Sequence, residues 1–239
     1  MDHTLLCESC GYEVAGLPGD ARCSECGRPV ADSSPERRAG SPWQRSPSLL
    51  AFLETNIRAV RRTRSLFDSI RIDIPSGIGL AAANHLLAAF LIVLPWSGVL
   101  IADPVRSARV SALWVVPLQT ATVACLLFLL TMVEWTGIQA YARSRRWRLT
   151  PAAAWQVCAH ASVGWVITGL TSWVGLIAWL NLSTLGGSTV SVLGELFAWS
   201  VPAFGAVFGL VIFELLVWTG LQRCRFANAP ASPGLAVAR

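Results

Sequence analysis

The feature that most constrains this chain is a series of four apolar stretches after residue 75. Each is long enough to cross a bilayer, which takes about 20 mainly apolar residues in a helix. The charge distribution agrees, since residues 1–75 hold 20 of the 33 charged residues. Overall only 14% of residues are charged, whereas soluble domains have about 25%. The sequence therefore predicts a polytopic membrane protein with a polar N-terminal third.

We place the four spans at about residues 77–101, 110–139, 152–182 and 190–220. The links between them are short, which favours antiparallel neighbours in a compact bundle. The predicted membrane domain is therefore all-α, a four-helix transmembrane bundle.

Arginine supplies the formal positive charge and collects on one side of this bundle. Five arginines lie between residues 58 and 71, and four lie between residues 143 and 148. Arg223 and Arg225 follow directly after the fourth span, whereas the opposite side has Arg106 and Arg109. Because basic residues are enriched in cytoplasmic segments, we predict a multi-pass protein of the cytoplasmic (inner) membrane with both termini in the cytoplasm.

The membrane domain contains an internal repeat. Trp-x-Val-Pro occurs at residues 114–117 and 199–202, and Trp-Thr-Gly-aliphatic-Gln occurs at residues 135–139 and 218–222. Both halves would enter from the same side, so the sequence predicts two repeated helical hairpins related by an axis along the membrane normal.

Four cysteines near the N-terminus have the spacing C-x2-C-x12-C-x2-C. They are Cys7, Cys10, Cys23 and Cys26. Two facing C-x-x-C turns can complete a tetrahedron of thiolates around one Zn²⁺ ion, although the same four thiolates could hold iron. Gly11 and Gly27 follow the second cysteine of each pair, where a positive φ angle lets backbone N–H groups turn toward the sulfurs. We predict a small β-hairpin zinc ribbon whose folding energy comes from the metal. Two disulfides are the alternative, and they would require an oxidising compartment.

The stretch "CGYEVAGLPGDARCSECG" resembles the zinc ribbons of form CxxCGYxxxGLP…CPECG that precede many multi-pass bacterial membrane proteins of uncharacterised function. The resemblance covers residues 5–29 and implies the same four cysteine ligands, with Ser24 where proline is common. A more distant similarity is to Yip-family membrane domains, which usually have five spans.

Nucleic acid is a poor candidate partner for the ribbon. Residues 1–28 carry two arginines against five acidic residues, a net charge of −3, and phosphate binding requires a basic surface. A structural module that presents a protein-binding surface is the expectation that remains.

The predicted organisation follows from these features. Residues 48–75 combine apolar residues at helical spacing with several arginines, which is typical of a helix in the headgroup region of a membrane; the same helix could instead pack under the bundle. The preceding segment is rich in Pro and Ser. We therefore assign a zinc ribbon (1–28), a flexible linker (29–47), an amphipathic interfacial helix (48–75), a four-span domain (76–222) and a cytoplasmic tail (223–239).

Two histidines and two glutamates fall at similar depths within the predicted spans. They are His85, Glu134, His160 and Glu214. Ionisable groups in a bilayer normally face inward and pair, so these four residues could converge on a proton or a divalent cation, or they could form clasps that fix helix register.

No catalytic signature accompanies these features, and we predict that the chain is not an enzyme. The function we favour is an integral membrane adaptor or scaffold whose ribbon recruits a cytosolic protein. Its predicted partners are the lipid bilayer and that protein, and a homo-oligomer is compatible with the sequence. The alternative is a small transporter of ions, protons or metal that uses the His/Glu layer.

Overall fold

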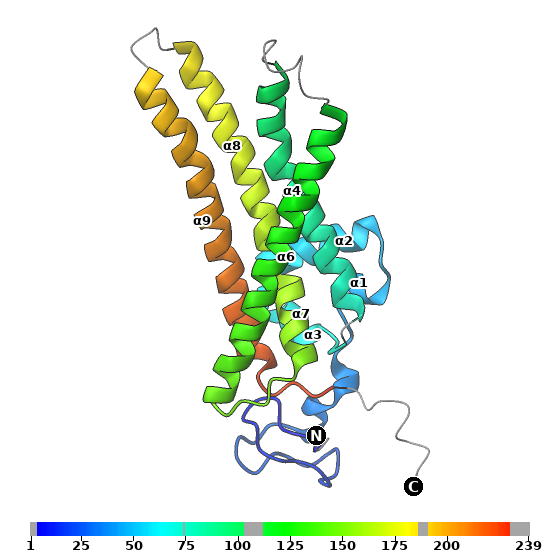
Figure 1. The fold of residues 1–239 in the computed structure, drawn as a ribbon. Helices are drawn as coiled ribbons and strands as arrows, with labels where there is room; N and C mark the ends of the chain where they lie inside the picture. The colour runs from blue at the N-terminus through cyan, green and yellow to red at the C-terminus, as the bar shows by residue number, and fades with distance from the viewer. Residues whose placement is uncertain (1–3, 74, 103–111, 186–190, 230–239) are drawn as a thin grey trace. The chain divides into compact units, whose positions relative to one another are not determined.

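The computed structural model of the chain describes residues 4–73, 75–102, 112–185 and 191–229 (Figure 1). These residues are mainly helical. The link that contains Arg106 and Arg109 lies outside the described residues, as does the predicted tail from residue 230. The helical elements are η1 (Val30–Ser33), η2 (Pro35–Arg37), α1 (Pro42–Arg45), α2 (Leu49–Arg61), α3 (Thr63–Ser69), α4 (Pro75–Ala102), α6 (Ala112–Ser144), α7 (Pro151–Ala161), α8 (Val163–Leu185) and α9 (Ser191–Cys224).

The described helices provide four segments long and apolar enough to cross a membrane. They are Pro75–Pro95, Trp114–Ser144, Pro151–Ile177 and Phe204–Cys224. The prediction of a multi-pass membrane protein with four such helices is confirmed at this level. The third segment is interrupted at Ser162, where α7 ends and α8 begins.

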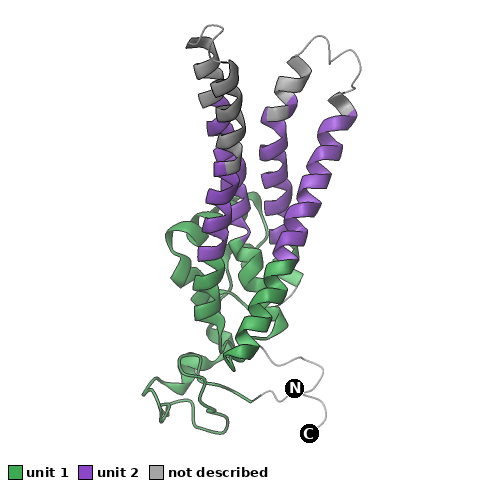
Figure 2. Cartoon of the chain, turned by 60° about the vertical axis from the view of Figure 1, so that its left-hand side comes forward, with its two compact units in different colours: residues 1–80, 133–161, 216–239 green, residues 81–132, 162–215 purple. Residues whose placement is uncertain are grey.

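The chain divides into two compact units, shown in two colours in Figure 2. Unit 1 consists of residues 1–80, 133–161 and 216–239, and unit 2 of residues 81–132 and 162–215. Each helical span therefore contributes residues to both units.

Unit 2 is built from four helices that touch through small residues and a few buried polar groups. In α8, a Cβ added at Gly164 would lie 2.7 Å from Cβ of Phe213, and one at Gly169 would lie 2.6 Å from Cβ of Leu91. The ring of Trp165 stacks on Phe213 with centroids 4.9 Å apart. Small residues let helix backbones approach closely where lipid supplies no hydrophobic driving force, so α8 lies against both α4 and α9.

In unit 1, residues 29–47 differ from the flexible linker predicted from their Pro and Ser content. They form η1, η2 and α1, and the side chains of Ser33, Arg38 and Ser41 are buried. Ser41 caps α1 by accepting from the backbone N–H of Gln44, and the Gln44 side chain accepts from the backbone N–H of Ser41. This reciprocal capping box satisfies backbone groups that a flexible segment would leave to water.

The single helix predicted over residues 48–75 is two helices, α2 and α3, separated at Arg62. One face of α2 is buried, through Ala51, Phe52, Thr55 and Ala59. The opposite face is apolar but exposed, and consists of Leu49, Leu50, Leu53, Ile57 and Val60. At about 100° per residue these five side chains form one stripe. Attachment of this stripe to a membrane surface stays a prediction.

Candidate metal centre

The N-terminal ribbon contains two loops with the same backbone hydrogen bonds, displaced by 16 residues. In the first loop, the backbone N–H of Cys7 donates to Tyr12 and that of Gly11 donates to Cys7. In the second, the N–H of Cys23 donates to Arg28 and that of Gly27 donates to Cys23. Each loop is therefore a tight turn that holds its two cysteines on one side.

Gly11 and Gly27 adopt positive φ angles of 82° and 70°. L-residues with a Cβ rarely adopt this conformation, so the positive φ predicted for the glycine after each C-x-x-C pair is confirmed. In the described part of the chain no extended strand forms; the ribbon instead has two isolated antiparallel bridges, Leu6–Glu13 and Arg22–Pro29.

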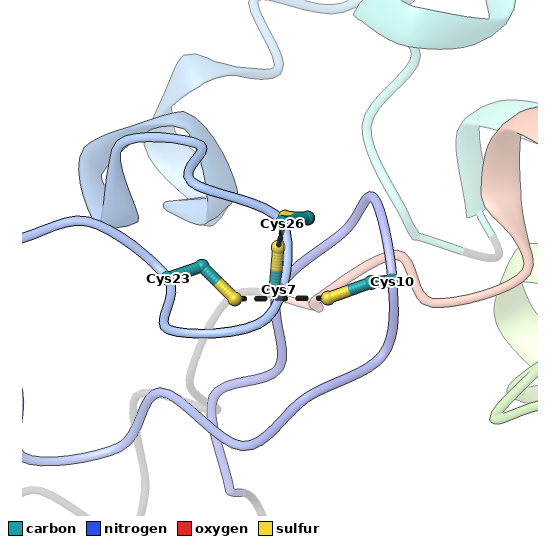
Figure 3. Close-up of side chains that lie close together, drawn as sticks. All are labelled: Cys7, Cys10, Cys23 and Cys26. Atoms are coloured by element: carbon teal, nitrogen blue, oxygen red, sulfur yellow. Dashed lines mark hydrogen bonds between the residues drawn. The ribbon is translucent and has the colours of Figure 1, made fainter.

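The two loops bring the four cysteines of the predicted metal site together (Figure 3). All four Sγ atoms lie within 4.8 Å of one another. The closest pairs join the two loops: Cys7 to Cys26 at 3.5 Å and Cys10 to Cys23 at 3.6 Å. A tetrahedron with Zn–S bonds of about 2.3 Å has S···S edges of about 3.8 Å, whereas disulfide sulfurs are about 2.05 Å apart. The spacing fits a four-thiolate metal site, and the cysteines are free rather than disulfide-bonded.

The pKa values of two of the cysteines also favour a bound cation. Burial disfavours the thiolate of Cys7, but the backbone N–H groups of Cys10 and Ser9 and the neighbouring thiols outweigh it and lower its pKa to about 7. Burial raises the pKa of Cys10 to about 12, and the adjacent thiols add to that effect. Cys7 therefore ionises more readily than Cys10, whose thiolate is disfavoured by burial and by the adjacent sulfurs. A bound cation would allow all four to ionise together.

The ribbon is held to the rest of unit 1 by a buried ion pair. Arg38 donates to both carboxylate oxygens of Glu8, at 3.1 and 2.8 Å. The same guanidinium donates to the backbone carbonyls of Phe67, in α3, and of Ile70, which caps the C-terminal end of α3. Arg38 is 4% exposed, so its bidentate contact with Glu8 is largely shielded from water. Charge-assisted hydrogen bonds are stronger in such surroundings than in water.

The C-terminal segment after α9 forms a second set of contacts with the ribbon. The Asn228 side chain accepts from the backbone N–H of Leu6 and donates to the carbonyls of Leu6 and Ser33. Its backbone N–H donates to Glu8, and Arg225 donates to the carbonyl of Ser9. The first cysteine loop is thus fixed to residues that follow the last span.

The histidines of the predicted membrane layer have hydroxyl partners. His85, in unit 2, lies 2.9 Å from Oγ1 of Thr131, which also accepts from Nε1 of Trp165 at 3.1 Å. His160, in unit 1, has Nδ1 2.9 Å from the carbonyl of Gln156 and Nε2 3.0 Å from Oγ of Ser41. Because Nδ1 of His160 donates to a carbonyl, Nε2 accepts from the Ser41 hydroxyl.

The glutamates of that layer are also divided between the units. Glu134 is half-buried in the part of α6 that belongs to unit 1, and Glu214 is exposed in the part of α9 that belongs to unit 2. Convergence of the two histidines and two glutamates on one ion stays a prediction, as does the transporter that would use it. The contacts of His85 and His160 fit the alternative reading, in which each histidine is part of a clasp between segments.

Sequence reasoning did not identify Glu8, Arg38, Asn228 or Ser41 as important. Their partners lie 25 to 222 residues away along the chain, apart from the short-range capping of α1. No spacing rule connects such residues. Composition could not have identified them either, because a charged and Pro-rich segment predicts a flexible linker rather than buried side chains.

Comparisons of this chain with protein-family models, with curated proteins and with solved structures found no match.

Proposed function

We propose that this chain is a membrane adaptor of the inner membrane, in which a zinc ribbon on the cytoplasmic side presents a rigid surface to a cytosolic protein. Two lines of reasoning support the cytoplasmic placement of both termini. Arginine collects on the ribbon's side of the spans, and free thiols in metal-site geometry suit a reducing compartment.

The observation that carries the proposal is the way the ribbon is held. Its first loop is tied to Arg38 and to Asn228, and the four clustered thiols connect this loop to the second. A module that is fixed at one end and cross-linked by a metal can present its other surface in a defined orientation, which lowers the entropy cost of binding a partner.

The surface left open has a definable chemistry. Tyr12 and Leu17 are 45% and 42% exposed, and Glu13, Asp20 and Glu25 are also exposed. Aromatic and aliphatic side chains with an acidic surround suit a protein surface that is apolar at its centre and basic at its rim.

Affinity capture from detergent-solubilised membranes, with zinc measured on the same sample, tests this function. A partner captured by the wild-type chain should be lost when Tyr12→Ala and Leu17→Ser are combined, while the zinc content stays unchanged. Leu210→Ser serves as the control, because Leu210 in α9 is as exposed as Leu17, at 42%, and lies outside both the ribbon and the stripe of α2. Capture that survives the double change, or is lost equally with the control, would refute the adaptor proposal.

The exposed apolar stripe of α2 supports a second element of the proposal, which is attachment of this helix to the membrane surface. Arg58 and Arg61 lie in its last turn, where they could contact anionic headgroups. A photo-crosslinking residue placed at Leu53 should label lipid in vesicles, and one placed at Glu13, an exposed residue of the ribbon, should label far less. Equal labelling at the two positions would contradict attachment through this stripe.

A further inference from the structure

Unit 1 contains a cavity that the metal site and the adaptor function do not use. Its volume is about 780 Å³, within the range of about 300–1,000 Å³ found for small-molecule sites. The polar side chains that line it include Gln139, Arg143, Arg148, Thr150, Glu36 and Asn228.

The cavity lies where one candidate span ends and the next begins. Gln139 and Arg143 lie in the C-terminal part of the segment Trp114–Ser144, and Pro151, which also lines the cavity, begins the segment Pro151–Ile177. Residues at the ends of spans are at the depth of lipid headgroups. A ligand in this cavity would therefore be at the membrane surface, next to the ribbon residues Thr4 and Leu5, which also line the cavity.

The polar lining favours an anion. Arg143 is exposed in the last turn of α6. Arg148 is oriented by Thr4, whose carbonyl and hydroxyl oxygens both accept from it. The cavity also includes the start of α7, where Thr150 caps the helix by accepting from Ala153 at 3.1 Å. Helix N-termini carry partial positive charge, and paired arginines bind phosphate oxygens through a planar fork of donors.

The remaining lining is apolar and includes Leu5, Leu149 and Pro151. A free inorganic anion has no apolar group to contact such a surface, whereas the glycerol and first acyl carbons of a phospholipid can pack against it. Basic pockets at the ends of membrane helices are known headgroup sites. We propose that this cavity binds a phosphate ester, and that the ester is the headgroup of an anionic phospholipid from the Arg-rich side of the membrane.

Glu36 is the one acidic side chain among the lining residues, and it makes the proposal easier to test. It accepts a hydrogen bond from Ser34, and its carboxylate opposes an anion in the cavity. Replacing it with glutamine removes that repulsion while keeping its size and shape. Glu36→Gln should therefore strengthen binding, whereas a change that merely damaged the fold would weaken it.

The experiment is a titration of the full chain in detergent, followed by native mass spectrometry. The probes are short-chain phosphatidylglycerol, phosphatidylcholine of the same chain length, and inorganic phosphate. We expect one phosphatidylglycerol per chain, bound at least about tenfold more tightly than the other two probes, a difference equivalent to about 1.4 kcal/mol. Arg143→Ala should weaken this binding roughly tenfold, because it removes charge-assisted hydrogen bonds.

Arg145→Ala is the matched control. Arg145 lies two residues after Arg143, just beyond the end of α6; it is exposed, and it contacts the ring of Tyr141 rather than the cavity. Both changes remove one positive charge from this end of α6, so equal losses would show that diffuse charge attracts the lipid and would overturn the proposal. Equal binding of the two lipids, or weaker binding by Glu36→Gln, would also overturn it.

If inorganic phosphate binds as tightly as phosphatidylglycerol, the apolar lining contributes nothing to affinity. That result would refute the claim that the bound phosphate ester belongs to a phospholipid. Should Arg143→Ala fail to fold, Arg143→Lys keeps the charge but loses the planar fork. That variant should show a smaller loss of affinity, and no loss at all would contradict a role for Arg143. None of these results depends on a protein partner, so they are separable from the test of the adaptor function.

Discussion

The ribbon end of unit 1 and the helical bundle of unit 2 are stabilised by different kinds of interaction. The ribbon relies on specific polar contacts between distant residues, such as Arg38 with Glu8 and Asn228 with Leu6. The bundle relies on close contacts at small residues, such as Gly164 against Phe213. The ribbon's buried core is small and centres on Cys7, Val14, Cys23 and Val30. Such a core supplies little stability, so we expect a bound metal and the ion pair to supply the rest. Apolar helices in lipid are stabilised instead by close packing of their surfaces.

This contrast predicts that the largest single effect comes from the thiol cluster. Changing Cys7 and Cys10 to serine together should remove the metal and unfold the ribbon, because structural zinc contributes on the order of 10 kcal/mol to such modules. Trypsin should then cut rapidly after Arg22, while the four-span region stays protected. Zinc content and peptide mapping measure both effects.

Cys125→Ser is the control for this experiment, since Cys125 is exposed and outside the cluster. It should retain zinc and resist trypsin as the wild-type chain does. A double cysteine variant that remained protected at Arg22 would show that the ribbon does not depend on metal.

The next largest effect is expected at the buried ion pair. Arg38→Ala leaves the Glu8 carboxylate without its bidentate partner, and breaking such buried pairs costs about 3–5 kcal/mol. Arg37→Ala is the neighbouring control: Arg37 pairs with Asp32, but its side chain is 60% exposed. Exposed pairs contribute about 0–1 kcal/mol. Thermal unfolding of both variants in detergent measures the difference, and equal destabilisation would contradict the role given to Arg38.

In the bundle, overpacking at Gly164 should produce a smaller loss. A Cβ there would lie 2.8 Å from the backbone N and Cα of Phe213, so Gly164→Ala forces α8 and α9 apart at a cost of about 1–3 kcal/mol. Gly137→Ala provides the control, because a Cβ at that position meets nothing within 4 Å. Denaturation by increasing amounts of sodium dodecyl sulfate compares the two, and a stable Gly164 variant would argue against this helix contact.

The smallest effect is expected from the hydroxyl that joins His85 and Trp165. Thr131→Val removes an acceptor for Nε1 of Trp165 and the partner of His85. Hydrogen bonds between membrane helices average about 0.6 kcal/mol and reach about 1.7, so the loss should fall in that range by the same denaturation assay. A much larger loss would indicate that His85 has a role beyond that of a clasp.

Sequence reasoning succeeded where local spacing determines structure. The C-x-x-C pairs, the glycines that follow them and the apolar length of four helices each follow from a short segment considered alone. It failed at residues 29–47, because Arg38 and Ser41 are buried by partners on distant segments, Glu8 and His160. It also missed the break at Ser162, since the apolar pattern continues through it.

The central claim is that one zinc ion joins the two cysteine loops of the ribbon. X-ray absorption spectroscopy on the full chain, purified in detergent without added metal and quantified for zinc, tests it most directly. The account predicts one zinc per chain, surrounded by four sulfur atoms at about 2.3 Å. A metal-free chain, or a metal with nitrogen or oxygen ligands in place of sulfur, would contradict it.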